Sequence, residues 1–180
     1  SITAALTLPR VLDRSADRTV MIVAAAVLTI TLAALAAISA TMTPGAAYWH
    51  VLLAGWLVMG VAYSASLTPS GRLLRRSANA EDRPALFAAQ FALRHVCWLI
   101  CYPLVGQLGA RVSMSAAFVG MAALSAIGVV AALRLWPAHD PDVIPHDHAD
   151  LPADDPHHAE HAKGDHAFVI DRRHPKWPNR

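Results

Sequence analysis

The chain has 180 residues, of which 55% are hydrophobic and 16% are charged, and its formal net charge is +2. No Asp, Glu, Lys or Arg occurs between Arg18 and Arg72, or from Val112 to Leu133. A water-soluble domain needs charged residues over its surface, so this pattern excludes one and predicts an all-α integral membrane protein with the lipid bilayer as its main partner. The weak net charge also argues against a nucleic-acid partner.

Four apolar segments are each long enough to cross a hydrocarbon core of about 30 Å as a helix. Turns are predicted after the first segment, at Thr43-Pro44-Gly45, and after the second, at Thr68-Pro69-Ser70-Gly71. Pro84 suits the first turn of the third helix. The predicted transmembrane region is 19–136, with spans at about 19–41, 47–68, 85–110 and 113–136. Residues 1–18 are expected to be the end of a preceding helix and a loop, which suggests a fragment of a longer protein.

Basic residues near the ends of these spans collect on one side of the membrane. Eight lie on one side, and Arg111 alone lies on the other. The positive-inside rule therefore places that side, and both ends of the chain, in the cytoplasm. The eight residues are Arg10, Arg14, Arg18, Arg72, Arg75, Arg76, Arg83 and Arg134.

Residues 8–18 resemble a degenerate copy of the loop signature of the major facilitator superfamily, G-x-x-x-D-[RK]-x-G-[RK]-[RK]. That signature lies between helices 2 and 3 and is echoed between helices 8 and 9. Asp13, Arg14 and Arg18 match it, whereas Asp17 stands in place of a base. An Asp at a helix end that pairs with Arg would hold one cytoplasmic conformation. The alternative is that these charges only set the topology.

A second match lies late in the third span. Residues 102–107 are similar to the G-P-x-x-G-G end of a motif found in helix 5 of antiporters of that superfamily and partly repeated in helix 11. Pro103 and Gly106 match, and together they would give a bendable helix that packs closely on a neighbour. An ordinary kinked packing helix is the alternative.

The resemblance implies that the four spans are helices 9 to 12 of a twelve-helix secondary transporter, with the preceding helices of the same protein as partners. It implies proton-coupled efflux across a bacterial inner membrane, with no enzymatic activity and no cofactor. A stand-alone four-helix membrane protein that binds metal through its tail, without transport, is the alternative.

The candidate transport pathway centres on two ionisable residues inside the third span, Arg94 and His95. A charge near mid-bilayer costs between about 2.5 and more than 10 kcal/mol unless it is paired or hydrated, so such residues usually have a function. Arg94 could bind an anion, and His95 could relay protons. The alternatives are snorkelling of Arg94 and a structural hydrogen bond from His95. Gln90, Trp56 and Tyr63 complete the predicted pathway.

The tail, residues 137–180, is rich in His, Asp and Pro and is expected to be disordered. Its imidazoles and carboxylates could bind Zn, Ni, Co or Cu ions, or the tail could simply be solvated. A small apolar island from Phe168 to Trp177 could dock on the transporter body or have no role. The candidate metal ligands are His146, His148, His157, His158, His161 and His166. Metal ions are therefore a possible cargo.

Overall fold

The computed structural model describes residues 16–138, 143–144, 168–171, 174 and 176–177. In this part of the chain there are four helices, each long and apolar enough to cross a membrane. The all-α membrane fold with four spanning helices is therefore confirmed. The helices are α2 (Asp17–Thr41), α3 (Ala46–Arg76), α4 (Arg83–Arg111) and α5 (Met114–Leu135).

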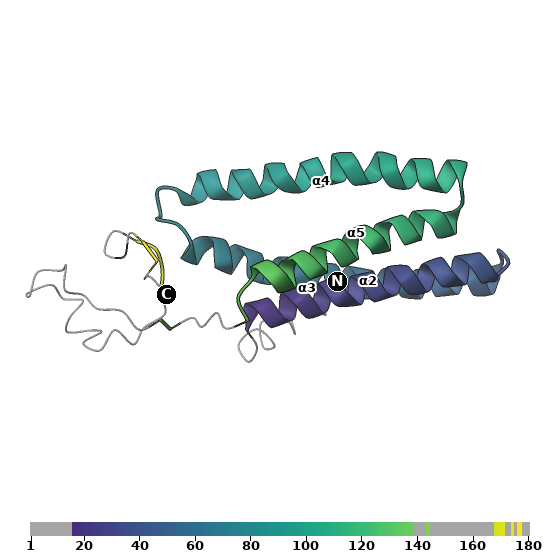
Figure 1. The fold of residues 1–180 in the computed structure, drawn as a ribbon, viewed down its shortest axis with the longest axis horizontal. Coiled ribbons are helices and arrows are strands. Elements are labelled where there is room, and N and C mark those ends of the chain that lie inside the picture. The colour runs from purple at the N-terminus through teal and green to yellow at the C-terminus, as the bar shows by residue number, and fades with distance from the viewer. Residues whose placement is uncertain (1–15, 139–142, 145–167, 172–173, 175, 178–180) are drawn as a thin grey trace, which may run out of the picture.

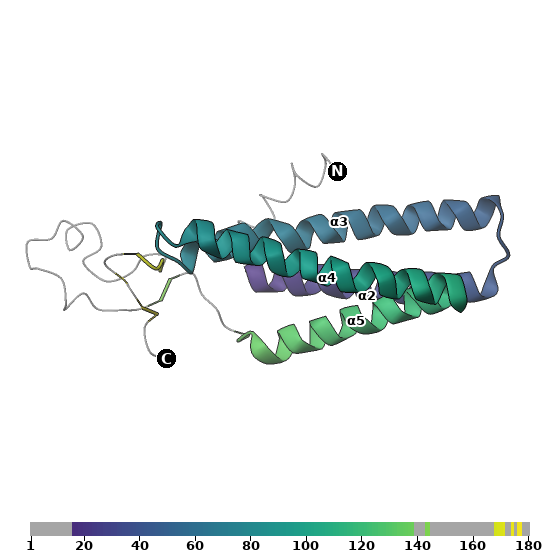
Figure 2. The ribbon, with the colours of Figure 1, turned by 90° about the horizontal axis from the view of Figure 1, so that it is seen from above.

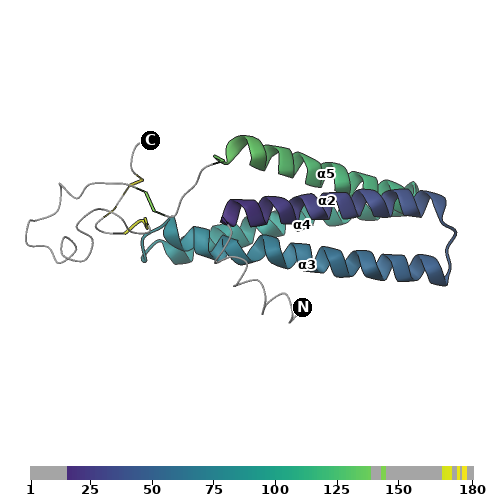
Figure 3. The same ribbon diagram turned by 90° about the horizontal axis from the view of Figure 1, so that it is seen from below.

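The helices run alternately up and down, with α2 packed between α3 and α5 (Figure 1). Helix α4 packs mainly on α5 and touches α3 only sparsely. In the view from above, α4 runs in front of α2 (Figure 2). The start of α2, the end of α3, the start of α4 and the end of α5 lie at one end of the bundle (Figure 3). We call it the basic end because it contains Arg18, Arg72, Arg75, Arg76, Arg83 and Arg134.

Small and hydroxylated side chains let α2 approach its neighbours. A Cβ atom added at Gly55 of α3 would lie 2.9 Å from Cδ2 of Leu35, which is only 2% exposed. Toward α5, the hydroxyls of Thr29 and Ser125 lie 2.7 Å apart, and Ser115 Oγ donates to the Ala36 carbonyl at 2.8 Å. Because lipid supplies no hydrophobic drive for helix association, such close contacts and hydrogen bonds hold membrane helices together.

The predicted turn at residues 68–71 is wrong, because α3 continues through Pro69 and ends at Arg76. Proline removes one helical hydrogen bond, but the Pro69 ring is fully buried and contributes packing. Neighbouring hydroxyls also bond to the backbone. Thr68 Oγ1 donates to the Ser64 carbonyl at 2.8 Å, and Ser70 Oγ donates to the Leu67 carbonyl at 2.6 Å. The helix therefore continues through the proline without ending.

Helix α4 differs from the others in that none of its residues is buried within the described part of the chain. Several of its large apolar side chains are more than half exposed, including Leu93, Leu99 and Ile100. Such a surface is stable only in contact with lipid or with further helices. Helix α4 therefore offers an uncovered apolar face in the described part of the chain.

Candidate functional site

Arg94 and His95 both lie near the middle of α4, between its ends at Arg83 and Arg111. His95 Nδ1 lies 2.7 Å from the Phe91 carbonyl oxygen, one turn earlier in the helix. A carbonyl oxygen only accepts hydrogen bonds, so Nδ1 donates, and the neutral ring then has its lone pair on Nε2. The geometry thus combines a structural hydrogen bond with a nitrogen that can take up a proton.

His95 is one member of a row of four rings along α4, which we call the ring row: Phe91, His95, Trp98 and Tyr102. The distances between successive ring centroids are 3.9 Å, 4.9 Å and 6.1 Å. Spacings of three and four residues place these side chains on one face of a helix. Sequence reasoning missed the row, although this spacing could have revealed it.

Arg94 lies beside the ring row. Its guanidinium carbon is 5.6 Å from the centroid of the Trp98 ring, a cation–π distance. Its Nε atom is buried and has no hydrogen-bond partner among the residues that the structure describes. The guanidinium therefore keeps hydrogen-bonding capacity that another group can use.

The other predicted pathway residues are more dispersed. Gln90 is half-buried one turn before Arg94 on α4. On α3, Trp56 and Tyr63 are 51% and 43% exposed, and Trp56 makes an edge-to-face contact with Trp49 at 6.0 Å. In the described part of the chain no hydrogen bond or ring contact joins these two α3 residues to Arg94. The structure thus groups the α4 residues but does not bring the α3 residues to them.

The two residues of the predicted helix kink, Pro103 and Gly106, both lie within α4. Helix α4 runs through Pro103, and a Cβ atom at Gly106 would meet no atom within 4 Å. The close contacts between α4 and α5 lie elsewhere. A Cβ atom at Gly109 would lie 3.8 Å from Ala117 Cβ, and one at Gly120 would lie 2.6 Å from Leu108 Cδ1. Gly120 was not singled out from the sequence, because nothing local distinguishes it.

At the basic end, an ion pair joins α2 to α3. Arg72 Nε donates to Asp17 Oδ2 at 3.0 Å, and Arg72 Nη2 contacts the other carboxylate oxygen. The Asp17 side chain is 7% exposed and that of Arg72 is 41% exposed. This two-point geometry fixes both side chains, as the planar guanidinium matches a carboxylate.

The ion pair uses a residue that sequence reasoning had treated only as a departure from the loop signature. The acid expected to pair was Asp13, which together with Arg14 lies outside the described residues. The third motif residue, Arg18, donates from Nε to the Trp136 carbonyl at 3.2 Å and so ties α2 to the end of α5. Asp17 is therefore the acidic residue that the structure adds to the candidate site.

The apolar island near the C-terminus contacts the end of α3, which is the first of the two alternatives considered from the sequence. We call residues 168–171, 174, 176 and 177 the docked segment. The Ile170 amide donates to the Arg76 carbonyl at 2.9 Å, and the Arg76 guanidinium lies 5.3 Å from the Trp177 ring centroid. Phe168 is 3% exposed and lies against Trp177 at 5.0 Å and His174 at 5.2 Å. Three aromatic rings thus anchor the segment.

The predicted metal ligands of the tail, from His146 to His166, lie outside the described residues. Among the residues that the structure does describe, no group of three His, Cys, Asp or Glu side chains could hold a metal ion. Cys97 and Cys101 are free thiols on α4. The described helices therefore offer no preformed metal centre.

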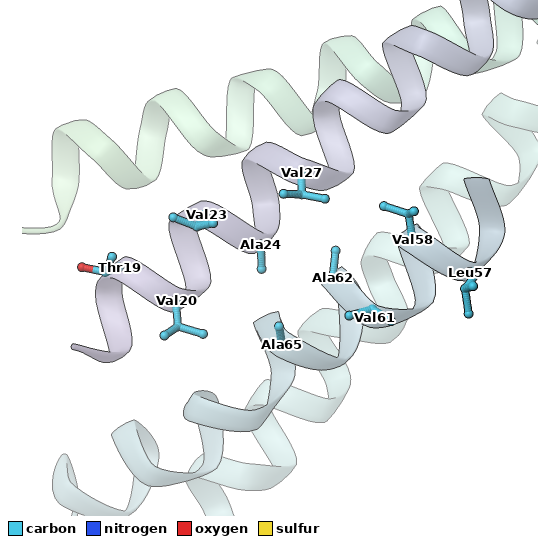
Figure 4. A pocket seen from close by; sticks show the side chains of 10 residues that line it. All are labelled: Thr19, Val20, Val23, Ala24, Val27, Leu57, Val58, Val61, Ala62 and Ala65. Atoms are coloured by element: carbon cyan, nitrogen blue, oxygen red, sulfur yellow. The ribbon is translucent and has the colours of Figure 1, made fainter. Parts of the chain in front are cut away.

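An apolar groove of about 580 Å³ lies between α2 and α3 (Figure 4). Apart from the Thr19 hydroxyl, its lining side chains are aliphatic, so it offers no group for proton coupling. The lining residues are Thr19, Val20, Val23, Ala24, Val27, Leu57, Val58, Val61, Ala62 and Ala65. The two ionisable residues of the predicted pathway, Arg94 and His95, lie instead on α4.

Comparison with protein families matches residues 1–170 to the model described as Major Facilitator Superfamily. Neither the comparison with curated proteins nor the comparison with solved structures found a significant match.

Proposed function

Because the chain belongs to the Major Facilitator Superfamily, we propose that it forms part of a secondary transporter that exports its substrate in exchange for protons. Transport across a membrane is the activity of this family, and the four apolar helices make the chain a multi-pass membrane protein. Proton coupling and export are the further steps of the proposal. The observation that carries them is the placement of Arg94 and His95 in the middle of α4.

In this mechanism His95 carries the coupling proton. Its Nδ1 hydrogen bond to Phe91 fixes the ring, and Nε2 is left to accept a proton from one side and release it to the other. Arg94 is the adjacent fixed positive charge. For exchange, the proton and the substrate must not be bound at the same time, so His95 releases its proton before the substrate binds beside Arg94 and takes one up after the substrate has left. Proton and substrate binding are thereby linked.

Alternating access requires contacts that exist in one conformation and break in the other. The Asp17–Arg72 pair suits this role, since it joins α2 to α3 at the basic end and one partner is nearly buried. We place the basic end, and both ends of the chain, in the cytoplasm of a bacterial cell, because positive residues favour that side of the inner membrane.

The uncovered face of α4 supports the participation of other helices. In the described part of the chain α4 has no buried residue, although it contains Arg94 and His95. A mid-membrane guanidinium facing only lipid would be costly, so the other helices of the transporter are expected to enclose this face around a hydrated cavity.

Inverted membrane vesicles that contain the full-length transporter test the proposal. After acidification of the vesicle interior, organic solutes are added singly, and a pH-sensitive dye reports proton release. We expect at least one solute to dissipate the gradient in the wild type and in Leu99→Ala, a control on the exposed surface of α4, but not in His95→Gln. A solute effect that persists undiminished in His95→Gln would contradict the proposed proton carrier.

Transition-metal export is a second candidate, supported by the eight His residues that follow Trp136. The test is the content of Ni, Co, Zn and Cu in cells that express the full-length transporter, compared with a deletion of residues 138–180. Lower metal content with the intact protein, weakened by the deletion, would support metal cargo. Unchanged content of all four metals would reject it. Membership of a transporter family favours either form of transport over a stand-alone metal-binding membrane protein.

A further inference from the structure

The ring row and Arg94 together have the chemistry of a binding site for a particular class of solute. Three of the rings are open to ligands, since Phe91, Trp98 and Tyr102 are 59%, 38% and 65% exposed in the described chain. The twelve residues from Phe91 to Tyr102 extend over about 16 Å of helix, which is longer than a single aromatic ring system needs. The row therefore presents several stacking surfaces along one helix face.

The charge beside these rings is positive, and the four described helices place no acidic residue beside it. The four helices contain one acidic residue, Asp17, which lies at the basic end and is paired with Arg72. Arg94 contacts the Trp98 ring through its π face, while its Nε atom is buried without a hydrogen-bond partner among the described residues. An anion can accept hydrogen bonds from the planar guanidinium of Arg94, whereas a cation would be repelled by its charge.

We propose that Arg94 and the ring row bind an aromatic carboxylate as the transported substrate. The carboxylate accepts hydrogen bonds from the planar guanidinium, and the aromatic ring stacks beside Trp98 or Phe91. This inference rests on the proposed transport function and adds the substrate class to it. It also gives His95 a defined place, because its ring lies between Phe91 and Trp98 in the row.

Isothermal titration calorimetry measures the affinity of the purified full-length transporter for four probes and so tests the substrate class. Benzoate has both features, cyclohexanecarboxylate lacks the aromatic ring, benzylamine reverses the charge, and NiCl₂ represents a metal cargo. We expect benzoate to bind about tenfold more tightly than cyclohexanecarboxylate, because aromatic stacking contributes to affinity only for the former. Benzylamine should not bind, and NiCl₂ should bind no differently to the wild type and to Arg94→Gln.

Substitutions then separate the two parts of the site. Arg94→Gln should weaken benzoate roughly 10- to 100-fold, as expected for loss of hydrogen bonds to a charged group, and Arg94→Lys should restore part of the affinity. Trp98→Leu should reduce the preference for benzoate over cyclohexanecarboxylate. Leu99→Ala, which alters an exposed side chain next to Trp98, should bind like the wild type. Circular dichroism and gel filtration identify any variant that fails to fold. If Arg94→Gln fails to fold, Trp98→Leu still tests the inference.

The inference and the function can fail separately. If benzoate does not bind while another solute still drives proton release in vesicles, the substrate class is overturned and the transport function stands. If benzylamine binds in preference to benzoate, or if Arg94→Gln abolishes the binding of NiCl₂, the site selects cations and the inference is overturned. If benzoate binds equally to the wild type and to a folded Arg94→Gln, binding occurs elsewhere and the inference is overturned. The absence of proton-coupled movement of any solute would overturn the proposed function itself.

Discussion

Single residues set how closely α2 and α3 approach, and Gly55 is the tightest point between them. We expect Gly55→Ala to be about 1–3 kcal/mol less stable than Gly60→Ala, because its new Cβ atom overpacks against the buried Leu35 side chain. Gly60 lies in the same helix, and a Cβ atom there meets nothing within 4 Å, so the comparison cancels the helix propensity of alanine. Thermal unfolding in detergent measures the difference. Equal stability of the two variants would mean that Leu35 adjusts without cost.

The stability that the Asp17–Arg72 ion pair contributes also depends on two single side chains. Arg72→Gln leaves the nearly buried Asp17 carboxylate without its guanidinium partner and should cost about 1–3 kcal/mol. Arg75→Gln removes an exposed charge at the same end of the bundle and should have little effect. Thermal unfolding again measures the cost, and a charge-swapped Asp17→Arg, Arg72→Asp double variant should recover part of it. No recovery would point to packing rather than charge.

Between elements, α2 and α5 are joined by hydrogen bonds of hydroxyl groups within the apolar spans. We expect a double-mutant cycle with Thr29→Val and Ser125→Ala to give a coupling energy of about 0.6 kcal/mol, the average found for such bonds in membranes. Thermal unfolding of the four proteins of the cycle supplies the data. A coupling near zero would show that the bond is replaced by others when it is broken, for instance by that from Thr29 to the Ala25 carbonyl.

The sequence predicted the helices better than it predicted the contacts between them. Four spans could be read from apolar length alone, since a bilayer demands about twenty apolar residues per helix. The end of α3 was misjudged because a Pro-Ser-Gly run normally marks a turn, and only the buried setting of Pro69 shows that a helix tolerates it. Local sequence does not report tertiary burial.

For the candidate site, too, the sequence revealed unusual residues but not the contacts between distant ones. Arg94 and His95 were identifiable because an ionisable residue within an apolar span is unusual. Asp17 was not identifiable as a site residue, because it does not match the loop motif. The sequence also does not reveal that Asp17 lies close to Arg72, which is 55 residues away. The predicted roles of Asp13, Arg14 and the tail histidines fall on residues that the structure does not describe, and they stay predictions.

At the scale of the whole molecule, the docked segment joins the C-terminal region to the transmembrane bundle. Phe168→Ala removes the most buried of its rings and should raise hydrogen exchange at the Ile170 amide roughly 10- to 100-fold, since burial of such a side chain contributes about 1.5–3 kcal/mol. Lys176→Ala changes an exposed residue of the same segment and should leave exchange unchanged. Mass spectrometry of the exchanged protein measures both. Equal exchange in the two variants would show that Phe168 does not anchor the segment.

The unbroken course of α3 through Pro69 has a mechanical consequence. At about 1.5 Å per residue this helix is roughly 46 Å long, about 16 Å more than a hydrocarbon core of about 30 Å requires. A tilt of about 5° around its midpoint would move Arg76 by roughly 2 Å, given half that length as the lever arm. The docked segment bonds to Arg76 itself and would therefore be carried along by this displacement. Rocking of α3 would thus move the docked segment relative to the other helices, and a change in the fluorescence of Trp177 would report each cycle of transport.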